Sequence, residues 1–556
     1  MYTKRLKATV SKNATSAFRI PHSTLRTVLI LGSAVMPDLT SSLLSNWKCI
    51  AACTLVSMSP FQYGIDFGAI GGLQAMRGFL QVFGHPDPHS PTGYNISTDR
   101  QQLISSLMTL GAFLSASFAG VFATKLGRRH CLWLASALCC ISNVVMMTTT
   151  NIAGLYIGRL LIGLANGWYM TFAQLYIQES SPARYRGMMI SVFQIWTSIG
   201  TLIGTVIDNA THDMEGRMSY IIPLGTIYIV PVFMSIGLFF IPESPRWLIL
   251  VDKQQEAEKA LLWMRPHPES VAGEVAEIQA AIDAEKATKA NANFVDIWKD
   301  PVDRRRTLLA IAAVSTQAAS GAMFMIAYGT YFFQMAQVGS PFMNSCILVA
   351  VGVVAIMVNS SVISKIGRRR VFLMTGLSIC GITQIIIAAV YHVHPGTTET
   401  GKVIVGLSVI YIIGYNGMVA AYAWLTGGEI PSQRLRSYTF GIASAVAFAG
   451  AWLATFTAPY FINPDSLNWG PEYGWIWGPS CFIAVIWVYF YLPEIKNRTL
   501  EEIDEMFEAR LPARKFRKYV CTKRLVVDGD DKTSERCDSD KDETIRQEVV
   551  TVEKSG

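Results

Sequence analysis

Long apolar runs recur along the chain and set its expected architecture. A helix needs about 20 apolar residues to cross a hydrocarbon layer roughly 30 Å thick, at about 1.5 Å per residue. Segments of this kind lie at 47–72, 101–123, 131–150, 153–176, 187–207 and 218–241, and again at 306–330, 342–365, 371–391, 402–426, 437–459 and 474–492. The pattern predicts an all-α membrane protein with twelve transmembrane helices in two six-helix bundles.

Polar segments divide the chain into five parts. We expect a leader over 1–46, a first bundle over 47–241, a helical linker over 242–305, a second bundle over 306–492 and a tail over 493–556. The linker combines mixed charge with helical periodicity, which predicts short amphipathic helices at a membrane face. From about residue 520 the tail has too little apolar surface to fold, so we expect disorder there.

Composition excludes several classes of function. Hydrophobic residues make up 51% of the chain and charged residues only 16%, against about 25% charged in a soluble domain. A soluble enzyme is therefore excluded. The ten cysteines and eight histidines lack the spacing of a disulfide framework or a metal site, so neither a metal nor an organic cofactor is expected.

The basic residues indicate topology and not nucleic-acid binding. They account for the net charge of +7 and gather in the loops after the second, fourth, eighth and tenth spans. The positive-inside rule places these loops, the linker and both termini in the cytoplasm. The opposite loops carry glycosylation sequons at Asn95 and Asn209. We expect a monomer in the plasma membrane, with the lipid bilayer as its surroundings.

Matching motifs in the two sets of spans indicate an internal duplication. Lys125-Leu-Gly-Arg-Arg129 follows the second span, and Lys365-Ile-Gly-Arg-Arg-Arg370 follows the eighth. Glu179-x-x-Pro-x-x-x-Arg186 follows the fourth span, and Glu429-x-Pro-x-x-x-x-Arg436 follows the tenth. In duplicated bundles of this kind the substrate binds between the halves at mid-membrane.

Three further motifs carry a resemblance to a known family. They are Pro242-Glu-Ser-Pro-Arg-Trp-Leu248, Gly158-Arg159 with two later glycines, and Pro493-Glu-x-Lys-x-Arg-Thr-Leu-Glu-Glu502. With them the chain resembles the major facilitator superfamily, and within it the sugar porters, over roughly residues 50–515. Phe61–Asp66 and Asn468–Gly470 are similar to fungal α-glucoside and hexose permeases.

The resemblance implies a proton-coupling pair within the membrane. Charges deep in a bilayer are costly and mark functional residues, and Asp66 and Arg159 lie within the first and fourth spans. In similar proton-coupled porters these positions hold the carboxylate that takes up the proton, which is the coupling ion, and the arginine that pairs with it. A change in their separation changes proton occupancy. Alternatively, Asp66 is a solvated residue at the outer mouth.

Matching acids and arginines in the cytoplasmic loops form a candidate gate. We expect ion pairs between the two halves when the inner side is shut, because a network that breaks on opening sets the balance between two states. The alternative, retention of loops on the basic side, explains the arginines but not the acids. The residues are Arg128, Glu179, Arg186, Glu243, Arg368, Glu429, Arg436 and Glu494.

Amides and aromatic rings are the expected sugar contacts. The resemblance implies such contacts at Gln194, Gln317, Ser320 and Trp424. Tyr328, Tyr331 and Asn416 are further candidates at helical spacing, with ordinary helix packing as their alternative. Ala318 and Met323 stand where hexose carriers show a glutamine and an asparagine. These losses weaken the case for a simple hexose, so a disaccharide or α-glucoside is expected as a substrate as well as a hexose.

These features predict sugar transport by proton symport with alternating access. Two alternatives stay open: a carrier for a non-sugar metabolite on the same scaffold, which the altered seventh span favours, and a non-transporting sugar sensor that signals through its tail.

Overall fold

The computed structural model is almost entirely helical and describes most of the chain. The described residues are 45–88, 92–181, 183–290, 295–335, 339–365, 368–432, 434–496, 498, 500–517 and 519. The expected leader, apart from its last two residues, and the tail beyond residue 519 lie outside them.

The first half contains the spans expected before the linker. Its helices are α3 (Trp47–Val56), α4 (Ser59–Leu73), α5 (Arg77–Phe83), α6 (Thr98–Leu126), α7 (Arg128–Thr148), α8 (Ile152–Ser180), α9 (Ala183–Thr211), α10 (Met218–Thr226) and α11 (Ile229–Gly237). A short antiparallel hairpin of β1 (His85–Pro86) and β2 (Tyr94–Asn95) lies between α5 and α6. The sequence predicts only a loop there.

The linker and the second half follow in the same order as the sequence predicts. The linker holds α12 (Pro245–Leu250), α13 (Gln254–Met264), the short helix η1 (Pro268–Ser270), α14 (Val271–Ala290) and α15 (Asp296–Lys299). The second half holds α16 (Pro301–Ala319), α17 (Ala322–Met335), α18 (Pro341–Lys365), α19 (Arg369–Val393), α20 (Thr398–Gly414), the π-helical turn η2 (Tyr415–Val419), α21 (Ala420–Glu429), α22 (Arg436–Ile462), η3 (Gly470–Tyr473) and α23 (Gly474–Tyr491). Helix α24 (Leu500–Glu508) closes the described part.

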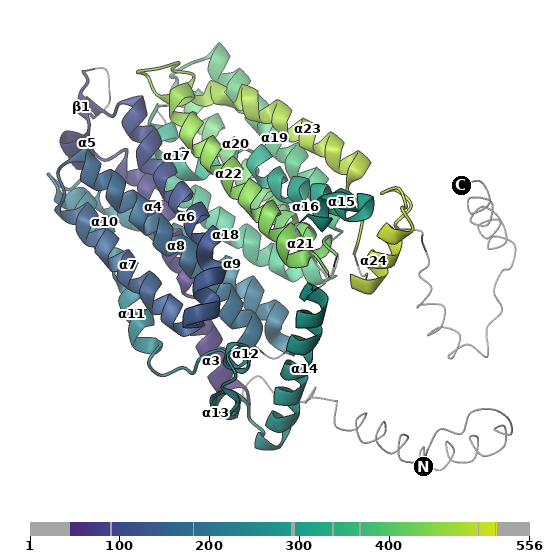
Figure 1. Cartoon of the computed structure of the whole chain (residues 1–556). Coiled ribbons are helices and arrows are strands. Elements are labelled where there is room, and N and C mark those ends of the chain that lie inside the picture. Colours follow the sequence, from purple (N-terminus) through teal and green to yellow (C-terminus); the bar gives the residue numbers. More distant parts are fainter. Residues whose placement is uncertain are drawn as a thin grey trace, which may run out of the picture.

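The two halves lie side by side (Figure 1). Helix α6 packs on α22, α9 on α18 and α4 on α17. We call the end that carries β1, β2 and α5 the hairpin end, and the end that carries α12–α14 the linker end; they lie at the upper left and the bottom of Figure 1. Buried side chains of both halves form one continuous apolar cluster.

Nine of the described helices, or unbroken runs of them, are long and apolar enough to cross a membrane. The remaining expected spans fall on α3–α4, α8 and α9. Each of these contains a buried charged residue, namely Asp66, Arg159 and Asp208 respectively.

Glycines let the backbones of α4 and α9 approach closely. A methyl group on Gly64 would lie 2.1 Å from the carbonyl oxygen of Thr197, and one on Gly68 would lie 2.4 Å from that of Thr201. Small residues at a helix contact permit this approach in membranes. The contact holds the helix that carries Asp66 in a defined position.

Two spans of the second half are broken within the membrane. Helix α16 ends at Ala319 with Ser320 as its C-cap, and Gly321 adopts a positive φ of 77° before α17 begins. Helix α20 passes through the π-helical turn η2 before α21. Breaks of this kind are common at functional sites because they aim side chains and free backbone groups into a bundle.

Candidate functional site

A buried ion pair joins the two charged residues of the first and fourth spans. Arg159 Nη1 lies 2.7 Å from Asp66 Oδ1, and each residue is only 1% exposed. Arg159 also donates from Nε to the carbonyl oxygen of Ile104, at 3.0 Å, and from Nη2 toward the sulfur of Met108, at 3.1 Å. Asp66 is therefore not a solvated residue at the outer mouth in this conformation.

Two polar residues that the sequence motifs do not single out complete this cluster. Asn166, two turns after Arg159 on α8, donates from Nδ2 to Asp66 Oδ2 at 3.2 Å. Gln62, one turn before Asp66 on α4, is fully buried, and neither atom of its side-chain amide has a hydrogen-bond partner among the described residues. The spacing of four from Gln62 to Asp66 and of seven from Arg159 to Asn166 was the available signal, since both place side chains on one helix face.

Three of the predicted sugar contacts of the second half, Gln317, Ser320 and Trp424, lie together at the break in α16–α17. Trp424 Nε1 donates to Gln317 Oε1 at 2.9 Å, and the indole ring packs edge-on against Phe440. The Ser320 hydroxyl is buried and donates to the carbonyl oxygen of Gln317. Ser320 therefore shapes the helix break, while the amide of Gln317 and the face of Trp424 are both partly exposed.

The remaining predicted contacts are scattered. Gln194 is exposed on α9, and Asn416 lies half-buried in η2 with its amide nitrogen against Gly352 of α18. Tyr328 is fully buried, and its hydroxyl donates to the carbonyl oxygen of Thr455 at 2.8 Å. In this conformation Tyr328 takes part in the packing of α17 against α22, and its contact with a sugar stays a prediction.

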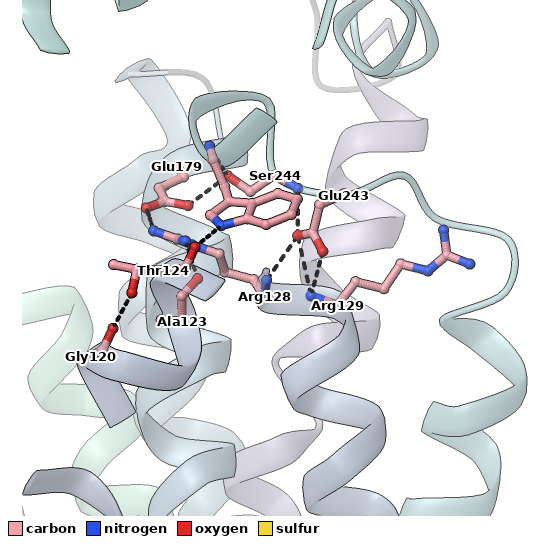
Figure 2. A network of polar contacts seen from close by, with 9 residues as sticks. Gly120, Ala123, Thr124, Arg128, Arg129, Glu179, Glu243 and Ser244 are labelled. Atoms are coloured by element: carbon pink, nitrogen blue, oxygen red, sulfur yellow. Dashed lines mark hydrogen bonds and ion pairs between the residues drawn. The ribbon is translucent and has the colours of Figure 1, made fainter. Parts of the chain in front are cut away.

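At the linker end of the first half, two acids organise the start of α7 (Figure 2). Arg128 Nη2 donates to Glu179 Oε1 at 2.7 Å, and the Ser244 hydroxyl donates to Glu179 Oε2 at 2.5 Å. Glu243 accepts from the backbone N–H groups of Arg128, Arg129 and Ser244 at 2.8–3.0 Å. Burial raises the pKa of the Glu243 carboxyl, and these three backbone donors partly offset that rise.

The second half repeats this arrangement at the start of α19. Glu494 accepts from the backbone N–H groups of Arg369 and Arg370, each at 3.2 Å, and Arg369 Nη2 lies 2.8 Å from Glu429 Oε1. The predicted partner Arg368 is exposed and precedes the helix. Arg369 thus takes the place of Arg128, because the helix starts one residue later in the Gly-Arg-Arg motif. The expected part of Arg368 in a gate between the halves stays a prediction.

The acids at matching positions consequently have a role within each half. A carboxylate at a helix N-terminus satisfies free N–H groups and interacts favourably with the helix dipole. Among the described residues, the acid–arginine pairs of these two motifs each join residues of one half. Arg436 makes no ion pair with a described residue, and the side chain of Arg186 lies outside the described part. The expected pairing between the halves applies to a conformation closed at this end and stays a prediction.

Polar contacts between the halves gather at the hairpin end. Asn463 Nδ2 donates to the carbonyl oxygen of Ile96 and to Gln101 Oε1 at 2.8 and 3.0 Å, and the hydroxyls of Thr98 and Ser466 lie 2.7 Å apart. The structure is therefore closed at the hairpin end.

The two sequons differ in their surroundings. Asn95 is 2% exposed, and its Oδ1 accepts from Ile96 N–H and from the Tyr331 hydroxyl. A glycan on Asn95 requires this end to be open. Asn209 is partly exposed and lies in the last turn of α9, where the sequence analysis had placed a loop.

Comparisons with known proteins agree with this architecture. The family model described as "Sugar (and other) transporter" matches residues 52–507. The structure of the xylose transporter XylE from E. coli in its inward open conformation is similar to this one, with a TM-score of 0.68 and 19% sequence identity. The match covers 82% of this chain and 99% of the XylE chain. At this identity the likeness shows the fold alone.

Curated relatives are similar over most of the chain. The high glucose sensor RGT2 of Saccharomyces cerevisiae is 29% identical over 87% of this chain and 63% of its own length, so the chain spans less than two thirds of that sensor. The major facilitator-type transporter ecdD of Aspergillus rugulosus is 27% identical over 83% of this chain and 87% of its own. The high-affinity glucose transporter ght2 of Schizosaccharomyces pombe is 27% identical, with 81% and 86% covered.

Proposed function

The chain belongs to the sugar transporter family of the major facilitator superfamily, and we propose that it carries a sugar or glycoside across a membrane together with a proton. The observation that carries the proposal is the ion pair of Asp66 and Arg159, buried among the helices of the first half. A membrane protein retains such a pair, despite its desolvation cost, where the charges serve transport.

The geometry of this pair supports proton coupling. The Asp66 carboxylate is stabilised by one cation and one amide, so its proton affinity depends on the position of α8 relative to α4. A movement that lengthens the contact with Arg159 favours protonation of Asp66. Protonation in turn frees Arg159, whose remaining contacts are a carbonyl oxygen and a thioether.

The proposed sugar contacts lie on both halves. Gln317 and Trp424 offer an amide beside an aromatic face, the combination that suits a sugar ring. On the first half we assign Gln194 and add Gln62, whose buried amide has no partner among the described residues and lies one turn from Asp66. This placement links sugar binding to the proton site.

Alternating access explains why contacts between the halves gather at one end. The hairpin end is closed by hydrogen bonds between the halves, whereas the acid–arginine pairs of the linker end stay within each half. We assign the linker end, with its basic loops, to the cytoplasm of a plasma-membrane protein. The conformation then corresponds to release of substrate on the inner side.

The test uses purified protein in proteoliposomes with an imposed proton gradient. A panel of radiolabelled glucose, maltose, xylose and polyols identifies the substrate, and a pH-sensitive dye records proton entry. Asp66→Asn is expected to abolish accumulation against a gradient while leaving exchange across equal concentrations. Asp213→Asn, at a side chain that is 90% exposed, is the matched control. Unchanged accumulation in Asp66→Asn refutes the coupling role.

A sensor is the second candidate function, because one relative is described as a high glucose sensor. A sensor binds sugar without net transport. In the same vesicles it would show saturable sugar binding, by quenching of tryptophan fluorescence, with neither exchange nor accumulation for any sugar.

A carrier for a non-sugar metabolite is the remaining alternative. Ala318 and Met323 reduce the number of amides in the seventh span, which favours a less polar substrate. Uptake of none of the sugars, together with proton entry driven by a glycoside or polyol of low polarity, would select this alternative.

A further inference from the structure

A second acid is buried at the seam between the halves. Asp208 lies in the last turn of α9, is 1% exposed, and neither carboxyl oxygen has a hydrogen-bond partner among the described residues. Its Oδ2 lies against Gly72 of α4, where a methyl group would be only 2.1 Å away. The acid therefore sits in a space that only a glycine leaves open.

The face of α9 that carries Asp208 is the face in contact with the second half. One turn before Asp208, the Thr205 carbonyl oxygen accepts from the Cys346 thiol of α18 at 3.3 Å. One turn after it, the ring of His212 stacks on Phe342 of α18 with 4.3 Å between centroids. Residues at spacings of three and four share one helix face, so Asp208 is covered when α18 closes on α9.

No cation compensates this carboxyl among the described residues. On α9, His212 bonds the Asn209 carbonyl oxygen and contacts Asp213. On α4, Asp66 lies almost two turns before Gly72, the residue against Asp208, and is paired with Arg159. On α10, Tyr220 accepts from Arg217, whose guanidinium also bonds the Met147 carbonyl oxygen. On α18, Cys346 is the ionisable group that interacts electrostatically with Asp208, and on α17 the hydroxyls of Tyr328 and Tyr331 are already engaged.

We infer that Asp208 is a second proton-binding site, occupied when the hairpin end is closed. An ionised carboxylate without a partner is too costly to bury, so Asp208 carries a proton when the hairpin end is closed. Opening of the hairpin end separates α9 from α18 and gives Asp208 access to water, where an aspartate ionises with a pKa of about 3.9. Proton uptake at Asp208 from the outer side therefore favours closure.

This inference rests on the alternating access of the proposed function, but it concerns a different acid from Asp66. The proton that binds at Asp208 forms an O–H bond with the carboxylate and is given up when the hairpin end reopens at a higher pH. The sign follows from linkage: the closed state binds the proton more tightly, so closure is favoured at low pH and is lost as the pH rises.

The first test observes the proton directly. Infrared spectra of substrate-free protein in lipid are expected to contain a protonated-carboxyl C=O band at about pH 7 that disappears in Asp208→Asn. Asp213→Asn, which removes a carboxyl whose side chain is 90% exposed, should leave the band unchanged. A band that survives in Asp208→Asn, or that is lost only in Asp66→Asn, overturns the assignment. Because no transport is measured, this result is independent of the vesicle assay.

The second test follows the conformation by hydrogen–deuterium exchange of residues 205–215 between about pH 5 and about pH 8. After correction for intrinsic rates, the ratio of open to closed protein is expected to rise up to about tenfold per pH unit in the wild type. Asp208→Asn, which cannot ionise, should stay protected throughout; Asp208→Ser, a smaller neutral residue, should do the same if the asparagine variant does not fold. A flat wild-type profile, or the same slope in both variants, refutes the coupling to closure.

Discussion

The ion pair of Asp66 and Arg159 allows a quantitative prediction, because both partners are almost fully removed from water. In Asp66→Asn the buried guanidinium loses the negative charge beside it and keeps only neutral acceptors, among them a carbonyl oxygen and a thioether. In Arg159→Met the carboxylate keeps only the amide of Asn166. Loss of one partner of a buried pair costs about 3–5 kcal/mol, since an uncompensated charge remains.

The double variant Asp66→Asn/Arg159→Met leaves no buried charge. We therefore expect its free energy of unfolding to fall by far less than the sum of the two single effects, with a coupling energy of about 3 kcal/mol. The three variants and the wild type form a double-mutant cycle. Each is measured by denaturant titration in detergent, with tryptophan fluorescence as the signal.

A neutral hydrogen bond on the same helix is the matched control. Tyr169 donates from its hydroxyl to Ser136 Oγ at 2.7 Å, in an equally buried place. Tyr169→Phe is expected to cost about 0.5–1.5 kcal/mol. Additive effects of the Asp66 and Arg159 substitutions, or single effects no larger than that of Tyr169→Phe, would show that the two charges do not depend on one another.

Further predictions concern the helix starts, the helix contacts and the sugar site. Arg369→Gln should lower the free energy of unfolding by about 1–3 kcal/mol, because it leaves the half-buried Glu429 without its arginine. Arg368→Gln, at an exposed residue, should change that free energy by no more than about 0.5 kcal/mol. Equal effects would contradict the finding that Arg369, and not Arg368, pairs with the acid. Gly68→Ala should cost about 1–3 kcal/mol in thermal unfolding, and Gly441→Ala, which has open space around it, should be neutral. Trp424→Phe loses the indole donor and should raise KM for the sugar several-fold in uptake assays without altering proton coupling; an unchanged KM removes the indole from the site.

The duplicated motifs have a local explanation within each half. In each half an acid from a distant loop accepts from the first N–H groups of a helix, and an arginine of that helix pairs with a second acid. A helix N-terminus attracts carboxylates wherever it lies. The matching acids therefore stabilise the turn after the second span of each half, and closure of the linker end would have to compete with this pairing.

Much of the architecture could be predicted because the thickness of the hydrocarbon layer sets the length of a membrane-spanning helix. The apolar runs predicted helices at each expected span, and the described helices coincide with them. The family resemblance likewise depended on short motifs of local structure, such as the turn with Gly127 at φ 84° that precedes α7. These features are encoded over a few residues, and a single chain displays them directly.

The pairing of Arg159 with Asp66 was expected from the resemblance, but its surroundings were not. Asn166 and Gln62 join the site through helix faces that meet across 100 residues or more of sequence, and only packing decides which faces meet. The one-residue shift from Arg368 to Arg369 depends in the same way on where α19 begins.

The amino-acid sequence determined that this chain is a membrane-spanning helical protein of two similar halves with a charged pair inside, because apolar length, basic loops and local motifs are properties of short segments. The tertiary structure alone decided which end of the molecule is closed and which acids lie without a partner. Asp208 illustrates the difference: in the sequence it reads as part of a polar outer loop, and only the approach of α4 and α18 makes it a buried acid. The proton occupancy of a carboxyl depends on burial and neighbouring charge, and both are set by residues distant in the chain.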